Sequence, residues 1–267
     1  YEHVSKFFRK NKPEYIVICS NKSGGIEANL KFPAELMDYN LVSQYNIIKV
    51  SHQYNVKKLM FIASSCVYPK NIKRPSKESD FLSGKVEDSN QSYSIAKISG
   101  IEMCRAYRLQ HKVNFFSVIP TNIYGPGESY EKKYLHVIPA LIKKIHSAKE
   151  KNKNCLKLLG DGKPVREFLY SDDFANACIK ILKNKKKFDL INIGSGKSLN
   201  IENLANKIKS IIGYNGKIYF SSKKLNGTNV KKLNFKKLRD TGWKPSVNLN
   251  LGLRETYFDY LNQIRYK

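Results

Sequence analysis

KLMFIASSC at residues 58–66 joins a run of apolar residues directly to two hydroxyls and a thiol. A short apolar run that ends in small polar residues is typical of a strand buried on both faces of a sheet. Runs of the same character occur at residues 15–18, 114–119 and 190–193. Apolar residues at helical spacing occupy residues 33–54, 93–110 and 171–182. This alternation predicts an α/β fold, a doubly wound parallel sheet of Rossmann-like type with helices on both faces.

The chain becomes rich in turns after Thr121, as in YGPG at 124–127 and GDGKP at 160–164. Shorter elements between these turns predict a second, smaller α/β lobe. The helix and strand expected over 171–193 return to the pattern of the first lobe, so the two lobes interleave. We expect the first lobe to comprise residues 1–122 and about 167–196, and the second lobe about 123–166 and 197–267.

The first residues predict a helix that leads into the strand at 15–18. A nucleotide-binding sheet normally opens with a strand, a glycine-rich turn and a helix whose N-terminus receives a pyrophosphate. No such turn precedes the strand at 15–18. We therefore expect a segment of about forty residues upstream of Tyr1, the usual size of the βαβ portion concerned.

Composition argues against several classes of protein. No apolar run approaches the eighteen or so residues of a membrane span, and the five cysteines form no Cys-x-x-Cys pair that would bind zinc. That cysteine pattern suits a reducing cytoplasm, where a sequon such as Asn21-Lys22-Ser23 carries no sugar. The formal net charge is +26, but the lysines are spread along the chain, which indicates a solvated surface rather than a nucleic-acid groove.

Tyr93 and Lys97 lie four residues apart in a predicted helix, and therefore on one helical face. A cation beside a phenol stabilises the phenolate and lowers its pKa from about 10, so the phenol can exchange a proton with a carbonyl or alcohol. We expect this effect at Tyr93. The same spacing also fits a pair on a helix surface, because the chain contains 17 tyrosines and many lysines.

Ser64 follows the predicted strand at 58–62 and so stands at its carboxyl end, the edge at which open α/β sheets bind ligands. A serine hydroxyl there can hydrogen-bond a substrate oxygen. The order of strand, serine and Tyr-x-x-x-Lys resembles the short-chain dehydrogenase/reductase superfamily. PTNIYGP at 120–126 resembles the extended branch of that superfamily, whose members act on nucleotide sugars.

Five segments narrow the resemblance within that branch: SSCVYPK at 64–70, AKISG at 96–100, PTNIYGP at 120–126, HVIPAL at 136–141 and REF at 166–168. They are similar to the GDP-L-fucose synthase family of NADPH-dependent 3,5-epimerase/4-reductases, which convert GDP-4-keto-6-deoxy-D-mannose to GDP-L-fucose. The similarity extends from about Tyr15 to residues 253–257. It implies NADPH as the cofactor, a GDP-linked 4-keto-6-deoxy sugar as the substrate, and a homodimer.

The resemblance also implies roles for individual residues. Ser64, Tyr93 and Lys97 would perform the reduction, with Tyr93 as proton donor to the oxygen on C4 and Lys97 holding the nicotinamide ribose. Cys66 and His136 would epimerise, since a proton next to a ketone is acidic enough for a thiolate and a histidine can return it. Cofactor contacts are implied for Ile62, Ala63, Ser64, Ser65, Tyr93, Lys97, Pro120, Thr121, Asn122, Ile123 and His136. Substrate contacts are implied for Lys144, Leu159, Arg166 and Asn226.

Some positions depart from the family pattern. Leu159 stands where the family usually has a tryptophan near the substrate, so a stacking contact is lost, and Asn226 stands where it has an aspartate. Arg166 suits bidentate contact with a phosphate, although its neighbour Glu167 also allows a surface ion pair. Lys144 also fits a solvated face. These departures affect the identity of the nucleotide sugar, which they leave open, more than they affect the class of reaction.

Two alternatives remain on the sequence alone. One is another nucleotide-sugar epimerase, dehydratase or 4-reductase of the same branch. The absence of an acidic residue between Ile62 and Lys70 counts against a dehydratase. The other is a non-catalytic Rossmann-like binding protein, against which the joint presence of Ser64, Tyr93 and Lys97 argues.

Overall fold

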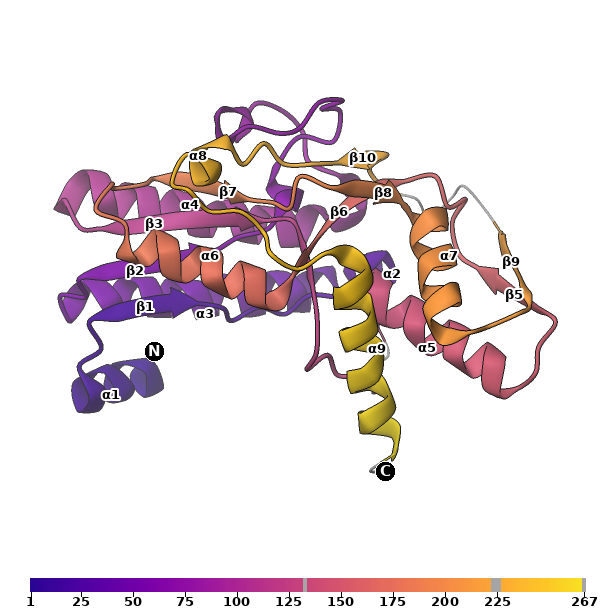
Figure 1. Ribbon diagram of the computed structural model, residues 1–267. Coiled ribbons are helices and arrows are strands. Elements are labelled where there is room, and N and C mark those ends of the chain that lie inside the picture. The colour runs from indigo at the N-terminus through magenta and orange to yellow at the C-terminus, as the bar shows by residue number, and fades with distance from the viewer. Residues whose placement is uncertain (132–133, 222–226, 266–267) are drawn as a thin grey trace.

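A four-stranded parallel sheet in the order β1-β2-β3-β7 forms the first lobe (Figure 1). The computed structural model describes residues 1–131, 134–221 and 227–265. The strands are β1 (Tyr15–Ile18), β2 (Lys58–Ile62), β3 (Phe115–Pro120) and β7 (Leu190–Ile193). All neighbouring strands of this sheet are parallel. The predicted α/β class and the four predicted strands are confirmed, with β3 displaced by one residue.

Helices cover both faces of this sheet, as the doubly wound prediction requires. On one face pack α1 (Glu2–Asn11), α3 (Pro33–Gln53) and α4 (Gln91–His111), and on the other α6 (Ser171–Lys183) and α8 (Lys236–Arg239). Successive side chains of β2 alternate between the two layers, since Leu59 and Phe61 join the first core cluster and Met60 joins the second. The apolar run at 58–62 is therefore buried on both sides.

The second lobe contains short strands and three longer helices. β4 (Asn122–Tyr124), β6 (Val165–Tyr170), β8 (Ser198–Asn200) and β10 (Val230–Lys231) form one sheet, and β5 (Cys155–Leu158) pairs with β9 (Lys217–Phe220). The helices α5 (Val137–Glu150), α7 (Ile201–Ile212) and α9 (Leu249–Arg265) enclose a separate hydrophobic cluster. The short helix α2 (Ile26–Lys31) and 3₁₀ turns at 65–67, 78–80 and 88–90 lie in the connections.

Two buried carboxylates fasten distant segments to each other. Glu167 of β6 accepts hydrogen bonds from the backbone N–H groups of Gly196 (2.7 Å) and Leu233 (3.0 Å). Asp173 of α6 accepts hydrogen bonds from the backbone N–H groups of Ser246 and Val247, both at 2.9 Å. Because both carboxylates are buried, these contacts fix how the C-terminal segments approach the sheet.

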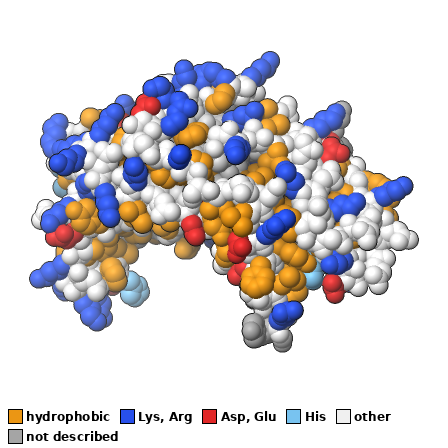
Figure 2. Space-filling view, in the orientation of Figure 1, with side chains coloured by type: hydrophobic (Ala, Val, Ile, Leu, Met, Phe, Trp, Pro, Cys, Tyr) orange, Lys and Arg blue, Asp and Glu red, His pale blue; other side chains and the backbone are white. Residues whose placement is uncertain are grey.

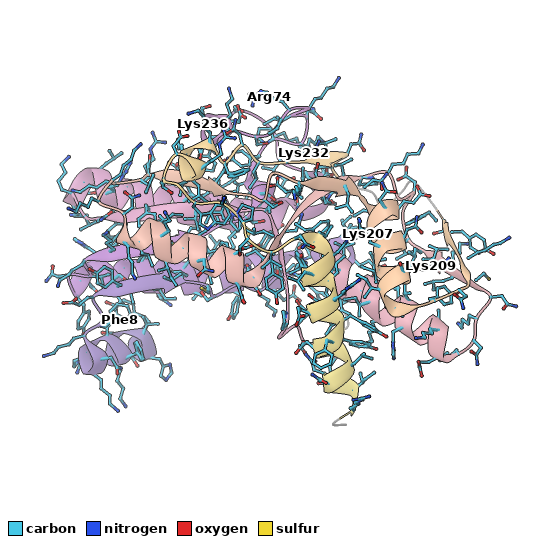
Figure 3. The ribbon with its side chains drawn as sticks, in the orientation of Figure 1. Phe8, Arg74, Lys207, Lys209, Lys232 and Lys236 are labelled. Atoms are coloured by element: carbon cyan, nitrogen blue, oxygen red, sulfur yellow. The ribbon has the colours of Figure 1, made fainter. Side chains whose placement is uncertain are left out.

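Positive side chains, those of Lys and Arg, are distributed over both lobes on the face of the molecule that Figure 2 shows. In Figure 3, Arg74 and Lys236 reach outward from the upper edge, and Lys207 and Lys209 lie on α7. Within the ranges described above, no helix combines the length and the apolar character needed to cross a membrane.

The close approach of α4 to β2 depends on Gly100. A Cβ at this position would overlap the ring of Phe61 and lie 2.9 Å from Oε1 of Gln44 on α3. We expect Gly100→Ala to lower the free energy of unfolding by about 1–3 kcal/mol, because an overfilled core must shift. Urea unfolding followed by circular dichroism measures this. Gly84→Ala is the control, since its nearest neighbour would lie at 3.4 Å, and an equal loss in both variants would contradict the packing argument.

Candidate functional site

The carboxyl ends of β1, β2 and β3 open into a cavity of about 410 Å³, here called the sheet-edge cavity. Parallel strands bring these ends to one edge of the sheet, which places residues from distant parts of the sequence together. Every residue for which sequence analysis predicted a catalytic or cofactor contact lines this cavity: Ile62, Ala63, Ser64, Ser65, Cys66, Tyr93, Lys97, Pro120, Thr121, Asn122, Ile123 and His136.

Ser64 and Cys66 are presented by a tight turn at the end of β2. Ser64 is extended, and its Oγ accepts a hydrogen bond from the backbone N–H of Cys66 at 3.4 Å, which starts the 3₁₀ turn at Ser65–Val67. Cys66 is buried and lines the sheet-edge cavity. The turn therefore holds a hydroxyl and a thiol two residues apart on one side of the cavity.

Lys97 reaches the same edge from α4. Only 2% of the residue is exposed, its Nζ donates to the carbonyl oxygen of Ile62 at 3.2 Å, and the Nζ lies 5.0 Å from the centroid of the Phe61 ring. Burial lowers the pKa of Lys97 to about 8, while the thiols of Cys66 and Cys19 act in the opposite direction. The group can therefore change its charge close to neutral pH.

Tyr93 lies one helical turn before Lys97, with the Nζ of Lys97 6.0 Å from the centre of its ring. Burial raises the pKa of Tyr93 well above its ordinary value, and hydrogen bonds with Asn21 and Ser64 only partly offset this. The expected lowering by a nearby cation is thus wrong for the protein without ligands. Loss of water around the phenolate is the largest cause of this shift, and the neighbouring thiol of Cys66 acts in the same direction.

His136 faces the cavity from the second lobe, at the residue that precedes α5. Its Nε2 lies 3.3 Å from the Oγ of Ser23, in the connection between β1 and α2. His136 also lines the neighbouring cavity described next. The imidazole therefore stands at the boundary between two cavities.

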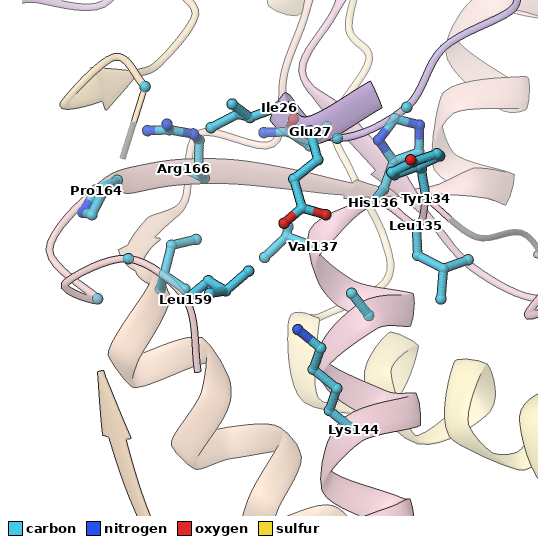
Figure 4. Close-up of a pocket in the computed structure, with 18 of the residues that line it drawn as sticks. Ile26, Glu27, Tyr134, Leu135, His136, Val137, Lys144, Leu159, Pro164 and Arg166 are labelled. Atoms are coloured by element: carbon cyan, nitrogen blue, oxygen red, sulfur yellow. The ribbon is translucent and has the colours of Figure 1, made fainter. Parts of the chain in front are cut away.

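A larger cavity of about 770 Å³, here called the lobe cavity, adjoins the first and lies between α2, α5 and β6. Asn122, His136 and Lys231 line both cavities. The predicted substrate residues Lys144, Leu159 and Arg166 line the lobe cavity, and Figure 4 shows Arg166 and Lys144 approaching it from opposite sides with Glu27 between them. Asn226 lies outside the described residues.

Arg166 belongs to a partly buried charged cluster. It pairs in register with Lys231 of β10, and the carboxylate of Glu87 lines the same cavity. Burial lowers the pKa of Arg166 to about 10, which Glu87 opposes, and burial also lowers the pKa of Lys231. Glu167 instead bonds to backbone N–H groups on the other side of β6. The alternative of a surface ion pair between Arg166 and Glu167 is therefore wrong.

The two cavities differ in chemistry. The sheet-edge cavity offers a phenol, a thiol, an imidazole and an ammonium, which can exchange protons with a carbonyl compound. The lobe cavity offers Lys143, Lys144, Arg166 and Lys231, which suit an anion such as a diphosphate. Among the described residues, no group of three or more His, Cys, Asp and Glu side chains could hold a metal ion.

Sequence reasoning missed several polar residues of these cavities, among them Asn21, Ser23, Glu87 and Lys231. Asn21 and Ser23 follow β1 at its carboxyl end, the same positional signal that identified Ser64 after β2, so they could have been found. Glu87 and Lys231 lie in connections or in a two-residue strand, and no local pattern marks them.

Comparison with known families agrees with this geometry. A family model described as "NAD dependent epimerase/dehydratase family" matches residues 1–194. The chain belongs to this family. GDP-L-fucose synthase of Sinorhizobium fredii (strain NBRC 101917 / NGR234) is 41% identical over 263 residues, which cover 98% of this chain and 84% of the relative.

Two solved structures of similar architecture contain a nucleotide. MlghC, a GDP-mannoheptose C4 reductase from Campylobacter jejuni with NADP bound, has 34% sequence identity and a TM-score of 0.86, over 97% of this chain and 85% of that chain. A GDP-L-fucose synthetase from Naegleria fowleri bound to NADP has 26% identity and a TM-score of 0.88, over 99% and 81%. The architecture of both lobes is therefore shared with these two solved structures.

The buried ammonium of Lys97 should lower the free energy of unfolding, and this effect can be measured. A lysine whose folded pKa is about 8, below its unfolded value of about 10.4, destabilises the fold while it is protonated. We expect Lys97→Met to raise the free energy of unfolding by about 1–2 kcal/mol at pH 7, after allowance for the lost hydrogen bond. The gain should decline as the pH rises from about 8 to 10.4.

Urea unfolding at pH 7 and pH 9.5 measures this difference. Lys10→Met, at an exposed position on α1, is the control and should show neither the gain nor its decline. A Lys97→Met protein that is less stable than the wild type at pH 7 would show that the ammonium stabilises the fold.

Proposed function

We propose that this protein is a GDP-L-fucose synthase, which epimerises GDP-4-keto-6-deoxy-D-mannose at C3 and C5 and reduces it at C4 with NADPH. The observation that carries the proposal is the grouping of Ser64, Tyr93 and Lys97 with Cys66 and His136 around one cavity. The first three side chains suit carbonyl reduction. The thiol and the imidazole add the two proton-transfer groups that a simple reductase does not need.

The relatives support the same activity. The Sinorhizobium fredii protein, with 41% identity over nearly the whole chain, bears the name GDP-L-fucose synthase. The Naegleria fowleri synthetase, whose structure was solved with NADP, shares the architecture of both lobes. Membership of the epimerase/dehydratase family makes the non-catalytic alternative the weaker reading.

The residues of the sheet-edge cavity fit a nicotinamide cofactor. Ile62 to Ser65 and Pro120 to Ile123 line this cavity, and the buried ammonium of Lys97 provides a hydrogen-bond donor there. NADPH bound there would supply the hydride. We propose that the first lobe, residues 1–122 and about 167–196, holds this cofactor, and that Lys97 contacts its ribose.

The reduction requires a proton for the oxygen on C4. Tyr93 suits this role because burial raises its pKa and keeps the phenol protonated until it is needed. After the transfer, the phenolate is stabilised by its hydrogen bonds with Ser64 and Asn21 and by the positive charge of Lys97. Ser64 can also hydrogen-bond the carbonyl oxygen of the sugar and hold it near the phenol.

The epimerisation requires a base and an acid on opposite faces of the sugar. We assign the base to the Cys66 thiolate, which removes a proton from the carbon next to the ketone and leaves an enolate. His136 then gives a proton to the same carbon from the other face. Cys66 comes from the first lobe and His136 from the second. After each epimerisation Cys66 is a protonated thiol and His136 has lost a proton. Proton transfer with solvent then restores the thiolate and the protonated imidazole.

The lobe cavity suits the nucleotide part of the substrate. We propose that the second lobe, about 123–166 and 197–267 apart from α8, which packs on the sheet of the first lobe, holds it, with Arg166 and Lys144 on the diphosphate. Their positive charges face the cavity from opposite sides (Figure 4). Leu159 is 53% exposed and offers an apolar contact in place of an aromatic one. Asn226 is proposed as a sugar or base contact from the family pattern alone.

A GDP-sugar C4 reductase without epimerase activity is the second candidate. The Campylobacter jejuni GDP-mannoheptose C4 reductase, at 34% identity, favours it. Cys66 and His136 distinguish the two readings, because only the coupled enzyme uses both groups for proton exchange at C3 and C5.

We further propose a homodimer in the cytoplasm. Tyr39, Val42 and Tyr45 occur at spacings of three along α3, and 45–60% of each is exposed. Such an apolar stripe supports contact with a second copy. The five cysteines are all free, and Cys66 must be a thiol for the proposed chemistry, which supports a reducing compartment.

The reductive role is tested by Tyr93→Phe, which removes the proton donor while preserving the ring. We expect oxidation of NADPH with the 4-keto sugar to fall by at least about 10²-fold, the usual range for loss of a general acid. Stopped-flow absorbance at 340 nm measures it. Cys66→Ser is the matched comparison and should retain some reduction of the unepimerised ketone. Full turnover by Tyr93→Phe would sink the assignment.

A further inference from the structure

The β1–α2 loop, residues 19–25, runs between the two groups of catalytic side chains. It follows β1 at the sheet edge and ends where α2 begins. Cys19, Asn21, Ser23 and Gly24 of this loop line the sheet-edge cavity. The loop is therefore the part of the first lobe that reaches toward His136 in the second.

Asn40 of α3 fixes the middle of this loop. Asn40 is 1% exposed, and its amide makes two hydrogen bonds with the backbone of Lys22. Oδ1 accepts from the backbone N–H of Lys22 at 3.2 Å, and Nδ2 donates to the carbonyl oxygen of Lys22 at 2.8 Å. Nδ2 also donates to the carbonyl of Leu36 at 2.6 Å, inside α3. A buried amide with these contacts has little freedom, so the backbone of Lys22 is held against a rigid helix.

The residues on either side of Lys22 contact the two proposed acids. The Oγ of Ser23 lies 3.3 Å from Nε2 of His136. Asn21 lines the sheet-edge cavity together with Tyr93, and hydrogen bonding by its side chain lowers the pKa of the phenol. Tyr93 belongs to α4 of the first lobe and His136 to the start of α5 in the second. The fixed backbone of Lys22 thus positions the side chains of its two neighbours, Asn21 beside Tyr93 and Ser23 beside His136.

We propose that the β1–α2 loop is a positioning device for both half-reactions, in which Ser23 orients His136 for proton return and Asn21 orients Tyr93 for reduction. This inference rests on the proposed function for its kinetic consequences. The hydrogen-bond arrangement itself does not depend on which sugar is bound.

A serine hydroxyl suits His136 because it can both donate and accept a hydrogen bond. It donates to an unprotonated Nε2 and accepts from a protonated one, so the ring keeps its orientation while it gains and loses a proton. An amide suits Tyr93 for a different reason. The N–H of Asn21 can donate to the phenolate that remains after the proton has left, which favours the transfer.

The first test observes His136 directly. The protein contains five histidines, and nitrogen-15 labelling of histidine with His136→Gln for assignment isolates its imidazole signals in NMR spectra. Ser23→Ala should change the Nε2 shift and the tautomer ratio of His136, and Ser23→Thr should preserve them. Identical His136 signals in the wild type and Ser23→Ala would overturn the proposal, whether or not the enzyme turns over this sugar.

The second test separates the two half-reactions. Epimerisation is followed as deuterium exchange into the keto sugar in D₂O without NADPH, and reduction as NADPH oxidation. We expect Ser23→Ala to slow the exchange about tenfold, as for loss of one hydrogen bond of about 1.4 kcal/mol, and Ser23→Thr to restore it. Asn21→Ala should slow the reduction about fivefold and leave the exchange within twofold of the wild type.

Ser20→Ala is the matched control from the same loop. Among the described residues, the Oγ of Ser20 is buried without a hydrogen-bond partner, so its removal should affect neither step. Equal losses of both steps in Ser23→Ala and Asn21→Ala would mean that the loop supports the fold only, and would overturn the proposal. A wild type that neither exchanges nor reduces the sugar would reject the proposed function, while the His136 spectra would still decide the positioning.

Discussion

The parallel alignment of β1, β2 and β3 is the constraint on which the site depends. Parallel strands end at one edge, so the residues that follow them, including Asn21, Ser64 and Thr121, meet although they are widely separated in the chain. The helix α4 is then held close to β2 by Gly100 and by the hydrogen bond from Lys97 to the carbonyl of Ile62. This approach brings Tyr93 beside Ser64. Had the strands been antiparallel, their polar ends would have alternated between two edges and no such cavity would form.

The electrostatics of the cavity follow from burial more than from pairing. Removal of water raises the pKa of Tyr93, which keeps the phenol neutral, and lowers the pKa of Lys97 to about 8, so Lys97 is still mostly protonated at pH 7. A neutral phenol is the form that can give a proton to a reduced carbonyl oxygen. The cost is a fold that is less stable while Lys97 is charged, which is the usual relation between a reactive site and stability. Burial has the same effect in the lobe cavity, where it lowers the pKa of Arg166 and of Lys231.

Much of the fold and part of the site could be predicted from the sequence. Strands such as 58–62 were predictable because burial on both faces demands an unbroken apolar run, and Tyr93 and Lys97 because four residues make one helical face. The direction of the Tyr93 pKa shift could not be predicted. The four-residue spacing reveals a neighbouring cation, but it does not show that folding removes water from the phenol. Glu87 and Lys231 were not predictable either, because they reach the cavity only through the tertiary arrangement of connecting segments. Asn21 and Ser23 could have been predicted as site residues, because they follow the carboxyl end of β1 just as Ser64 follows the carboxyl end of β2.

The central claim is that one cavity performs two kinds of chemistry on one sugar. It is tested most directly by incubating the protein with GDP-4-keto-6-deoxy-D-mannose and NADPH deuterated at the transferred position, in D₂O, and analysing the product by NMR. A coupled epimerase and reductase gives a sugar that carries solvent deuterium at C3 and C5 and cofactor deuterium at C4. A product that carries cofactor deuterium at C4 but only protium at C3 and C5 would contradict the claim, and would identify a C4 reductase in which Cys66 and His136 transfer no protons.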